Sequence, residues 1–301
     1  MPGFSRRHLV VLALLTLVWG LNWPVLKVSV ADFPPLTFRT ASLWLSLPVY
    51  ALVLRRQRVP LALARPDWPQ VAWLALFNVA SWNALMILGI PLLTSGRAAV
   101  LFYTMPIFSA ILGQVVFHDR LGLRAWAGVA AAAVGVLLLL WNELAHISGS
   151  ALGVALMLAA AACWALGTQL LRRSRLALPL LALTFWMTVC SVVLLTPIAW
   201  FMEQGRWHLP GMVTTLGLLY NAVLAMAFAQ TAWFFLARTL PPVASTLSVM
   251  MIPVIGVFTG ALWLGEVLHW QDWSAMALIL LAIAAVLLPA RTPEVASQNG
   301  R

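Results

Sequence analysis

Long apolar stretches follow one another along almost the whole chain, and only short polar connections separate them. A helix needs about 20 predominantly apolar residues to cross the hydrocarbon core of a bilayer. Ten stretches reach this length, so the pattern predicts an all-α integral membrane protein with ten transmembrane helices. We expect these helices at about 8–30, 35–54, 70–92, 95–117, 123–141, 150–171, 178–202, 212–237, 243–264 and 270–289.

The composition is that of a chain whose surface faces lipid. Of the 301 residues, 63% are apolar and 9% are charged, against about 25% charged residues in a typical globular domain. A soluble fold of this length could not bury so much apolar surface, so the lipid bilayer is an expected partner. The end of the chain is markedly polar, and we predict a disordered cytoplasmic tail at 291–301.

The positive charges are concentrated on one side of the predicted topology. The chain has 18 lysine and arginine residues and a net charge of +10. Four of them, Lys27, Arg39, Arg97 and Arg206, fall at one set of helix ends, and the other fourteen fall at the opposite set or in the terminal segments. Because cytoplasmic loops are enriched in basic residues, both termini are predicted to be cytoplasmic. The charge therefore requires no nucleic-acid partner.

The second half of the chain repeats the first. With an offset of 147 residues, the segment 96–126 aligns without a gap on 243–273. With an offset of 145 residues, Trp19 of the W-G-L-N-W-P segment meets Trp164. A signal peptide is the alternative for the first apolar stretch, but this polar segment and its later copy favour a permanent helix.

Five helices in each half make the two repeats inverted, because an odd number forces the second half to enter the membrane from the opposite side. The predicted repeats are 1–145 and 146–290. Inverted repeats are typical of secondary transporters, which expose a site near the midplane to either side in turn. Pro106 and Pro253 occupy corresponding positions in the fourth helix of each repeat. We predict that both are hinges, with a static kink as the alternative.

These features resemble the drug/metabolite transporter superfamily, EamA type. The resemblance rests on ten helices in two halves, W-G-L-N at 19–22, Arg39 after a Pro-rich first loop, and an acidic residue ending each helix that carries a central proline. Within the superfamily, the tryptophan content and length look most like the YddG-like aromatic amino-acid exporters of bacterial inner membranes. The resemblance implies a central cavity, alternating access and export of amino acids or similar metabolites. Gly167 and Trp186 replace Asn22 and Arg39 in the second repeat, so the expected site is asymmetric.

Aromatic and polar side chains interrupt several apolar stretches at membrane depth. An indole N–H in hydrocarbon needs a partner, so these side chains face other helices or a cavity. Trp19, Asn22 and Trp23 have the spacing of one helix face, and Pro24 is a predicted point of flexure. For any one residue, packing between helices is the alternative. The predicted substrate-binding residues are Trp19, Asn22, Trp23, Asn78, Ser81, Trp82, Tyr103, Trp164, Trp186, Gln230 and Trp233.

Three basic residues, Lys27, Arg39 and Arg97, stand closest to the membrane interior, all toward the predicted outer side, and Arg39 lies at the start of the second helix. The side chain of Arg39 either snorkels to the membrane surface or attracts a substrate carboxylate. In both cases we expect it in an outer vestibule.

The middle parts of the predicted helices contain no acidic residue and no histidine, the residue types that membrane enzymes and proton relays require. All eight acidic residues and all five histidines lie near helix ends, in loops or in the tail, which argues against an enzyme and against a dedicated proton relay. Cys163 and Cys190 offer neither a disulfide framework nor metal spacing, so no metal or cofactor is expected. A channel, or a receptor or structural protein without transport, is the alternative to a monomeric carrier of a small-molecule substrate. Aromatic and other apolar amino acids are the leading substrates, and other small hydrophobic metabolites or drugs come second.

Overall fold

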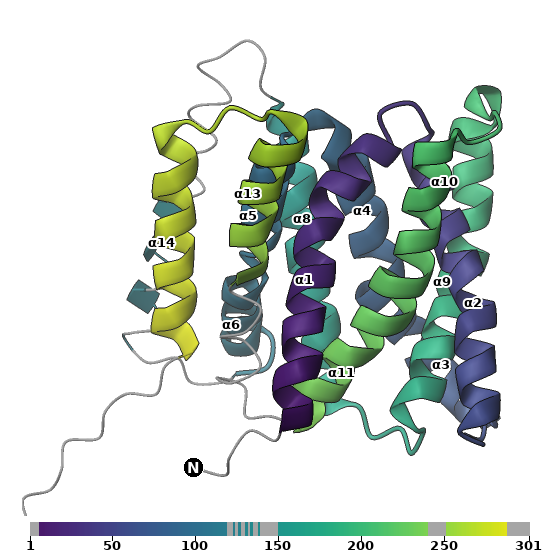
Figure 1. Cartoon of the computed structure of the whole chain (residues 1–301). Helices are drawn as coiled ribbons and strands as arrows, with labels where there is room; N and C mark the ends of the chain where they lie inside the picture. The colour runs from purple at the N-terminus through teal and green to yellow at the C-terminus, as the bar shows by residue number, and fades with distance from the viewer. Residues whose placement is uncertain are drawn as a thin grey trace, which may run out of the picture.

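The computed structural model describes residues 6–118, 150–239 and 251–287, together with isolated positions between 123 and 138. Within these residues every regular element is helical, and the helices stand side by side in one bundle (Figure 1). Before the first gap the elements are α1 (Arg6–Ser29), α2 (Pro35–Arg56), η1 (Arg65–Asp67), α3 (Trp68–Ala75), η2 (Leu76–Ala80), α4 (Ser81–Gly89), η3 (Ile90–Leu92), α5 (Ser95–Phe102) and α6 (Met105–Val115). After it follow α8 (Ala151–Arg173), α9 (Leu180–Glu203), η4 (Gln204–Arg206), α10 (Met212–Leu219), η5 (Tyr220–Ala229), α11 (Gln230–Thr239), α13 (Met251–Leu264) and α14 (Trp270–Leu287).

Seven helical stretches of the described chain are long and apolar enough to cross a membrane, which makes this a multi-pass membrane protein. They are His8–Ser29, Pro35–Arg56, Arg65–Leu92, Ser95–Val115, Ala151–Arg173, Leu180–Arg206 and Met212–Leu236. Each coincides with a predicted stretch. The apolar helix Met251–Leu264 is shorter, and α14 follows the predicted stretch 270–289 as far as Leu287. Most of 123–141, the start of 243–264 and the tail 291–301 lie outside the described residues.

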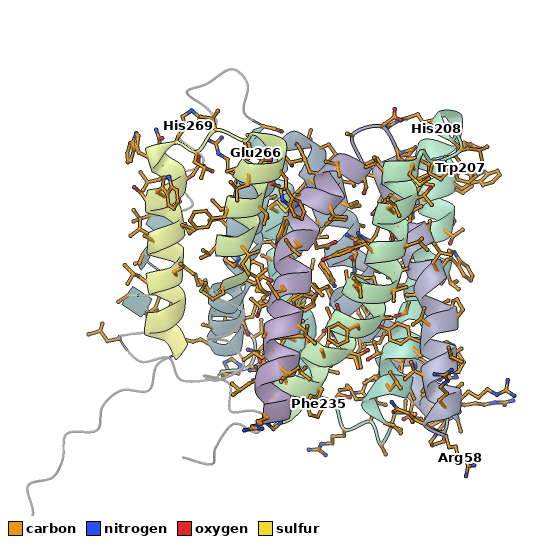
Figure 2. The ribbon with its side chains drawn as sticks, in the orientation of Figure 1. Arg58, Trp207, His208, Phe235, Glu266 and His269 are labelled. Atoms are coloured by element: carbon orange, nitrogen blue, oxygen red, sulfur yellow. The ribbon has the colours of Figure 1, made fainter. Side chains whose placement is uncertain are left out.

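The two ends of the bundle carry different side chains (Figure 2). Trp207, His208 and Glu266 lie at one end, here called the Glu266 end. Arg58 and Phe235 lie at the opposite end, here called the Arg58 end. The first helix, α1, runs from the Arg58 end to the Glu266 end.

Helices in corresponding places of the two sequence halves run in opposite directions. The start of α2 donates hydrogen bonds to Glu203 at the end of α9. In the same way, the start of α5 donates to Glu266, which follows α13. Both pairs are therefore antiparallel and meet at the Glu266 end. At this end α8 also starts, because Gly153 packs against Leu93 there, whereas α1 finishes there.

The third membrane-spanning stretch of each half contains a π-helical segment. In the first half η2 separates α3 from α4, and in the second half η5 separates α10 from α11. A π-helix moves the backbone hydrogen bonds to a wider spacing, and such segments are frequent at functional sites. The sequence predicts continuous helices here, because nothing in the apolar pattern distinguishes a π-helical turn from an α-helical one.

The predicted hinge prolines differ in what they do to the backbone. Pro24 lies inside α1, which continues through it. Before Pro106, by contrast, Tyr103 and Thr104 leave the helix and separate α5 from α6. Proline has no N–H to donate to the carbonyl four residues earlier, which accounts for this break. Pro253 lies near the start of α13. A hinge function of the three prolines stays a prediction.

A close contact between α1 and α13 joins the first half of the chain to the second. A Cβ atom added to Gly20 would lie 2.5 Å from Cγ2 and 2.7 Å from Cβ of Ile255. Small residues at such contacts are typical of membrane proteins, because van der Waals packing drives helix association where lipid is as apolar as leucine. The glycine therefore sets the distance between these two helices.

Gly20→Ala is expected to destabilise the protein by about 1–3 kcal/mol, because the added methyl group overlaps Ile255. The measurement is thermal unfolding of the purified protein in detergent. Gly205→Ala is the control, since a Cβ atom at Gly205 would meet nothing within 4 Å. Ile255→Ala should restore part of the stability lost in Gly20→Ala. Equal stability of the Gly20 and Gly205 variants would contradict this account of the contact.

Candidate functional site

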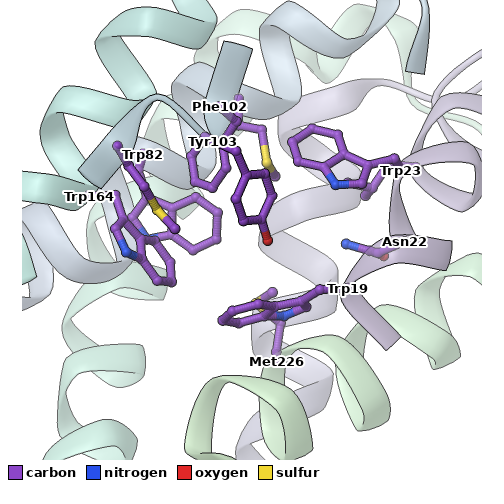
Figure 3. A pocket seen from close by; sticks show the side chains of 11 residues that line it. Trp19, Asn22, Trp23, Trp82, Phe102, Tyr103, Trp164 and Met226 are labelled. Atoms are coloured by element: carbon purple, nitrogen blue, oxygen red, sulfur yellow. The ribbon is translucent and has the colours of Figure 1, made fainter. Parts of the chain in front are cut away.

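Aromatic side chains from several helices surround a narrow cavity inside the bundle (Figure 3). The space open to the centre of a water-sized sphere is about 30 Å³. That is room for a water molecule but not for an organic substrate, so lining side chains must move before one can bind. The lining residues are Trp19, Asn22, Trp23, Leu26, Trp82, Met86, Phe102, Tyr103, Met105, Trp164 and Met226.

Indole rings that line the cavity pack against one another edge to face. The ring centroids of Trp82 and Trp164 are 4.5 Å apart with an angle of 80° between the ring planes. Trp19 meets Trp164 in the same way, at 5.9 Å and 83°. This arrangement suits the positive edge and negative face of aromatic rings. It leaves flat apolar surfaces toward the cavity.

The polar edges of two indoles point away from the cavity to backbone carbonyls. The Nε1 atom of Trp82 donates to the carbonyl oxygen of Asn78, one turn earlier, at 2.6 Å. The Nε1 atom of Trp19 donates to the carbonyl of Ala225 in η5, at 3.4 Å. Since both N–H groups have partners in the protein, the rings can lie in the bilayer without exposing an unpaired donor.

Two polar groups point into the cavity. Figure 3 shows the hydroxyl group of Tyr103 and the amide of Asn22 directed into the space between Trp19 and Trp23. Tyr103 is one of the two residues that break the helix between α5 and α6. Asn22 is 8% exposed, and its Oδ1 atom has no hydrogen-bond partner in the described part of the chain. These groups give an apolar cavity a small number of hydrogen-bonding positions.

The structure brings six of the predicted substrate-binding residues together in this cavity. They are Trp19, Asn22, Trp23, Trp82, Tyr103 and Trp164. The other five predicted residues lie outside the lining. Five lining residues were not predicted, because Leu26, Met86, Phe102, Met105 and Met226 are apolar residues in apolar stretches and carry no polar signal.

Asn78 has a supporting position behind the cavity wall. Its Nδ2 atom donates to the carbonyl of Gly167 in α8, at 2.8 Å, and its own carbonyl accepts the N–H of Trp82. A Cβ atom at position 167 would lie 2.8 Å from the backbone nitrogen of Asn78, so α8 can approach η2 this closely because residue 167 is glycine. This explains why the second half has Gly167 where the first has Asn22.

Trp186 does not reach the cavity, contrary to the expectation from the sequence. Its Nε1 atom donates to the carbonyl of Leu61 at 2.9 Å, and its ring packs against Trp68 with centroids 5.1 Å apart. Ser81 is half-buried and is likewise absent from the lining. Gln230 is buried, and neither polar atom of its side chain has a partner among the described residues.

Trp233 lines a vestibule at the Arg58 end. This vestibule has a volume of about 510 Å³ by the same measure and is lined by Thr168, Leu171, Arg172, Ser174, Arg175, Leu176, Trp233 and Phe234. The ring of Trp233 also contacts Trp19, with centroids 6.1 Å apart. A residue of the vestibule lining therefore packs against a residue of the cavity wall.

Two carboxylates close the bundle at the Glu266 end. Glu203 accepts the backbone N–H of Leu36 at 3.0 Å and the N–H and hydroxyl groups of Thr37 at 2.7 and 2.8 Å. Glu266 accepts the N–H and hydroxyl groups of Ser95 at 2.7 and 2.8 Å and the N–H of Gly96 at 3.3 Å. A carboxylate at a helix N-terminus satisfies unpaired N–H groups and the positive end of the helix dipole. We call these two contacts the carboxylate clasps.

Further charged contacts reinforce the same end. Arg97 donates to both carboxylate oxygens of Asp272, from Nε at 2.6 Å and from Nη2 at 3.4 Å. The Nζ atom of Lys27 donates to the carbonyl oxygens of Ile90, Pro91 and Leu93. The first contact joins α5 to α14, and the second joins α1 to η3, at the end where the clasps already join α2 to α9 and α5 to the end of α13.

Arg39 lies inside the protein and not in a surface vestibule. Its side chain is 0% exposed, so it does not snorkel to the membrane surface. The Nη1 atom donates to Oδ1 of Asn221 at 3.3 Å and lies 3.8 Å from the sulfur of Met226. Both contacts come from η5, so the cation sits between α2 and the π-helical segment.

Comparison of the sequence with known protein families identifies the family of this chain. The profile of the EamA-like transporter family matches residues 7–141 and again residues 151–288. The chain belongs to this family. One match falls in each predicted repeat, and the membership makes the protein a transporter that acts on a small molecule in a membrane.

Relatives named as transporters align over most of the chain. The "Uncharacterized inner membrane transporter YedA" of Escherichia coli (strain K12) is 27% identical, covering 91% of this chain and 88% of that protein. A "Probable amino-acid metabolite efflux pump" of Salmonella typhimurium is 28% identical, covering 98% of this chain and all of that protein. A solved crystal structure superimposes with a TM-score of 0.68 over 94% of this chain and 98% of that chain. At 17% identity, this likeness shows the fold alone.

Asn78→Ala is expected to lower stability by about 0.5–1.5 kcal/mol, because it removes the hydrogen bond that holds α8 against η2. Ser81→Ala, three residues further along, should change stability by less. Thermal unfolding in detergent compares the two variants. If Asn78→Ala leaves stability unchanged, the supporting role is wrong.

Proposed function

We propose that the protein is a secondary carrier that exports small amphipathic metabolites, with aromatic and other apolar amino acids as the leading class. The cavity carries this proposal: indole faces form its walls, and Asn22 and Tyr103 supply its polar groups. Aromatic walls accommodate an apolar side chain and attract a cationic amine by cation–π interaction. The name of the Salmonella relative, which aligns along almost the whole chain, supports the same substrate class.

In this proposal the Arg58 end faces the cytoplasm. Arg55 and Arg56 end α2, Arg58 follows them, and Arg172 and Arg173 end α8 at the same end. Basic residues concentrate on the cytoplasmic side of membrane proteins. Both termini are then cytoplasmic, and the bacterial inner membrane is the proposed location, as the name of YedA states for that relative.

With this orientation, the structure corresponds to a state closed to the outside. The carboxylate clasps and the Arg97–Asp272 pair lie at the outer face, while the vestibule at the inner face reaches Trp233. Alternating access would break the clasps and close the vestibule as the repeats 1–145 and 146–290 rock against each other. The opposite directions of corresponding helices and the two separate family matches support an inverted repeat of ten helices.

Other small hydrophobic metabolites or drugs form the second candidate class. Three unbranched methionines, Met86, Met105 and Met226, complete the cavity wall. Methionine side chains adapt to differently shaped apolar partners. A cavity of this kind would accept ligands without an amino-acid backbone.

Trp164→Phe is expected to raise the KM for phenylalanine about 5- to 10-fold, because an indole face of the cavity wall is replaced by a smaller ring. The measurement is uptake of radiolabelled phenylalanine by liposomes that contain the purified protein, with and without a pH gradient. Trp186→Phe is the matched control: it changes the same residue type in the next helix, outside the cavity. An equal effect of both variants would contradict the placement of the site, and an absence of saturable amino-acid flux in the wild type would overturn the substrate class.

Replacing both clasp carboxylates, by Glu203→Gln and Glu266→Gln, is expected to open the outer face. Glutamine keeps the shape but loses the charge that binds the helix N-termini. A cysteine at Leu26, placed in a chain without Cys163 and Cys190, reports access to the cavity. Its labelling by a membrane-impermeant maleimide added outside should rise about tenfold, which corresponds to about 1.4 kcal/mol. Asp67→Asn, at the opposite end, should leave labelling unchanged, and unchanged labelling in the double variant would show that the clasps do not control access.

A further inference from the structure

A buried cation in the membrane-spanning part of the protein has donors without partners. Within the described part of the chain, the Nε and Nη2 atoms of Arg39 have no hydrogen-bond partner, and no carboxylate forms an ion pair with the guanidinium. A guanidinium presents five N–H donors and keeps its charge. Burying this charge inside a membrane-spanning bundle without an anion is unfavourable, and such residues mark substrate or ion pathways.

A neutral side chain, Asn221, orients the guanidinium of Arg39 but supplies no negative charge to balance it. Asn221 donates from Nδ2 to the carbonyl of Gly217 at 3.1 Å, which turns its Oδ1 atom toward the Nη1 atom of Arg39. The guanidinium is therefore held from one side by a neutral amide. The remaining donors keep their capacity for an anionic ligand.

Met226 connects this cation to the central cavity. Its sulfur lies 3.8 Å from Nη1 of Arg39, and the same side chain lines the cavity. Met226 is unbranched and can adopt other rotamers at low cost. Because the cavity has to widen before any organic substrate binds, a rotation of Met226 would both make room and bring the guanidinium to the cavity wall.

We propose that Arg39 is the carboxylate anchor of the central site, covered by Met226 until a substrate binds. This inference rests on the proposed function and selects between its two candidate classes. The carboxylate pairs with Arg39, with the amide of Asn22 and the hydroxyl group of Tyr103 as further donors. The apolar side chain and the ammonium group lie against the indole faces. The site then requires a zwitterionic amino acid and discriminates against neutral or cationic molecules that lack a carboxylate.

The test compares phenylalanine with phenylalaninamide, which differs from it by the loss of the carboxylate charge. Proteoliposomes containing the wild type should transport phenylalanine with a KM about 10- to 100-fold lower than the inhibition constant of the amide, as expected for a charge-assisted hydrogen bond in the interior. Arg39→Gln should raise the KM for phenylalanine by a similar factor and abolish the preference. Asn221→Ala, which removes the neutral support and leaves the charge, should keep the preference.

The possible outcomes separate the anchor from the proposed function. If the wild type transports no amino acid, the proposed function fails. If phenylalanine is transported but Arg39→Gln weakens phenylalanine and its amide equally, Arg39 is structural and the anchor is wrong. Should Arg39→Gln not fold, Arg39→Lys decides: a smaller but remaining preference for phenylalanine supports the anchor, and an unchanged preference overturns it.

Discussion

The hydrocarbon core of a bilayer offers no water to an N–H group, so a backbone or indole N–H in this bundle is stabilised by an acceptor within the protein. The indoles show how the chain meets this requirement. Trp82 and Trp19 donate to backbone carbonyls, and the lipid-exposed Trp44 donates to the hydroxyl group of Thr196 at 3.0 Å. With the N–H fixed, the orientation of each ring is fixed as well. The hydrogen bonds of Trp82 and Trp19 therefore help to set the orientation of the rings that line the cavity.

The same requirement explains the contacts that close the Glu266 end. The first N–H groups of a helix have no partner in their own helix. At the starts of α2 and α5 the missing acceptors are Glu203 and Glu266, which come from the second half of the chain. Each contact therefore satisfies a helix end and joins the two halves at once. In the proposed alternating-access cycle, water would replace these partners when this end opens, so the contacts could break and form again.

Arg39 departs from this pattern. Asn22 and Gln230 also have buried polar atoms without partners in the described part of the chain, but these side chains are neutral. Arg39 carries a charge, and only one neutral acceptor and a thioether lie beside its guanidinium. A sequence selected for stability alone would place an apolar residue or a carboxylate partner here. A buried guanidinium whose Nε and Nη2 donors lack partners, next to a narrow cavity lined by methionines, is consistent with the proposed site for an anionic group before its ligand is bound.

The order of residues along the chain predicts the membrane class, most of the spans and the aromatic character of the cavity. Apolar length and helical spacing depend on local residue order, so seven of the spans and the Trp19–Asn22–Trp23 face could be read directly. Which residues contact one another depends on how the helices pack. Trp186 looked equivalent to the cavity tryptophans, but its helix turns it toward Leu61. Met226 carried no signal, and only the packing of η5 against α1 and α2 places it between the cavity and Arg39. A side chain's partners depend on how helices far apart in the chain rotate and approach, and that is set by contacts such as Gly20 on Ile255, which no single stretch encodes.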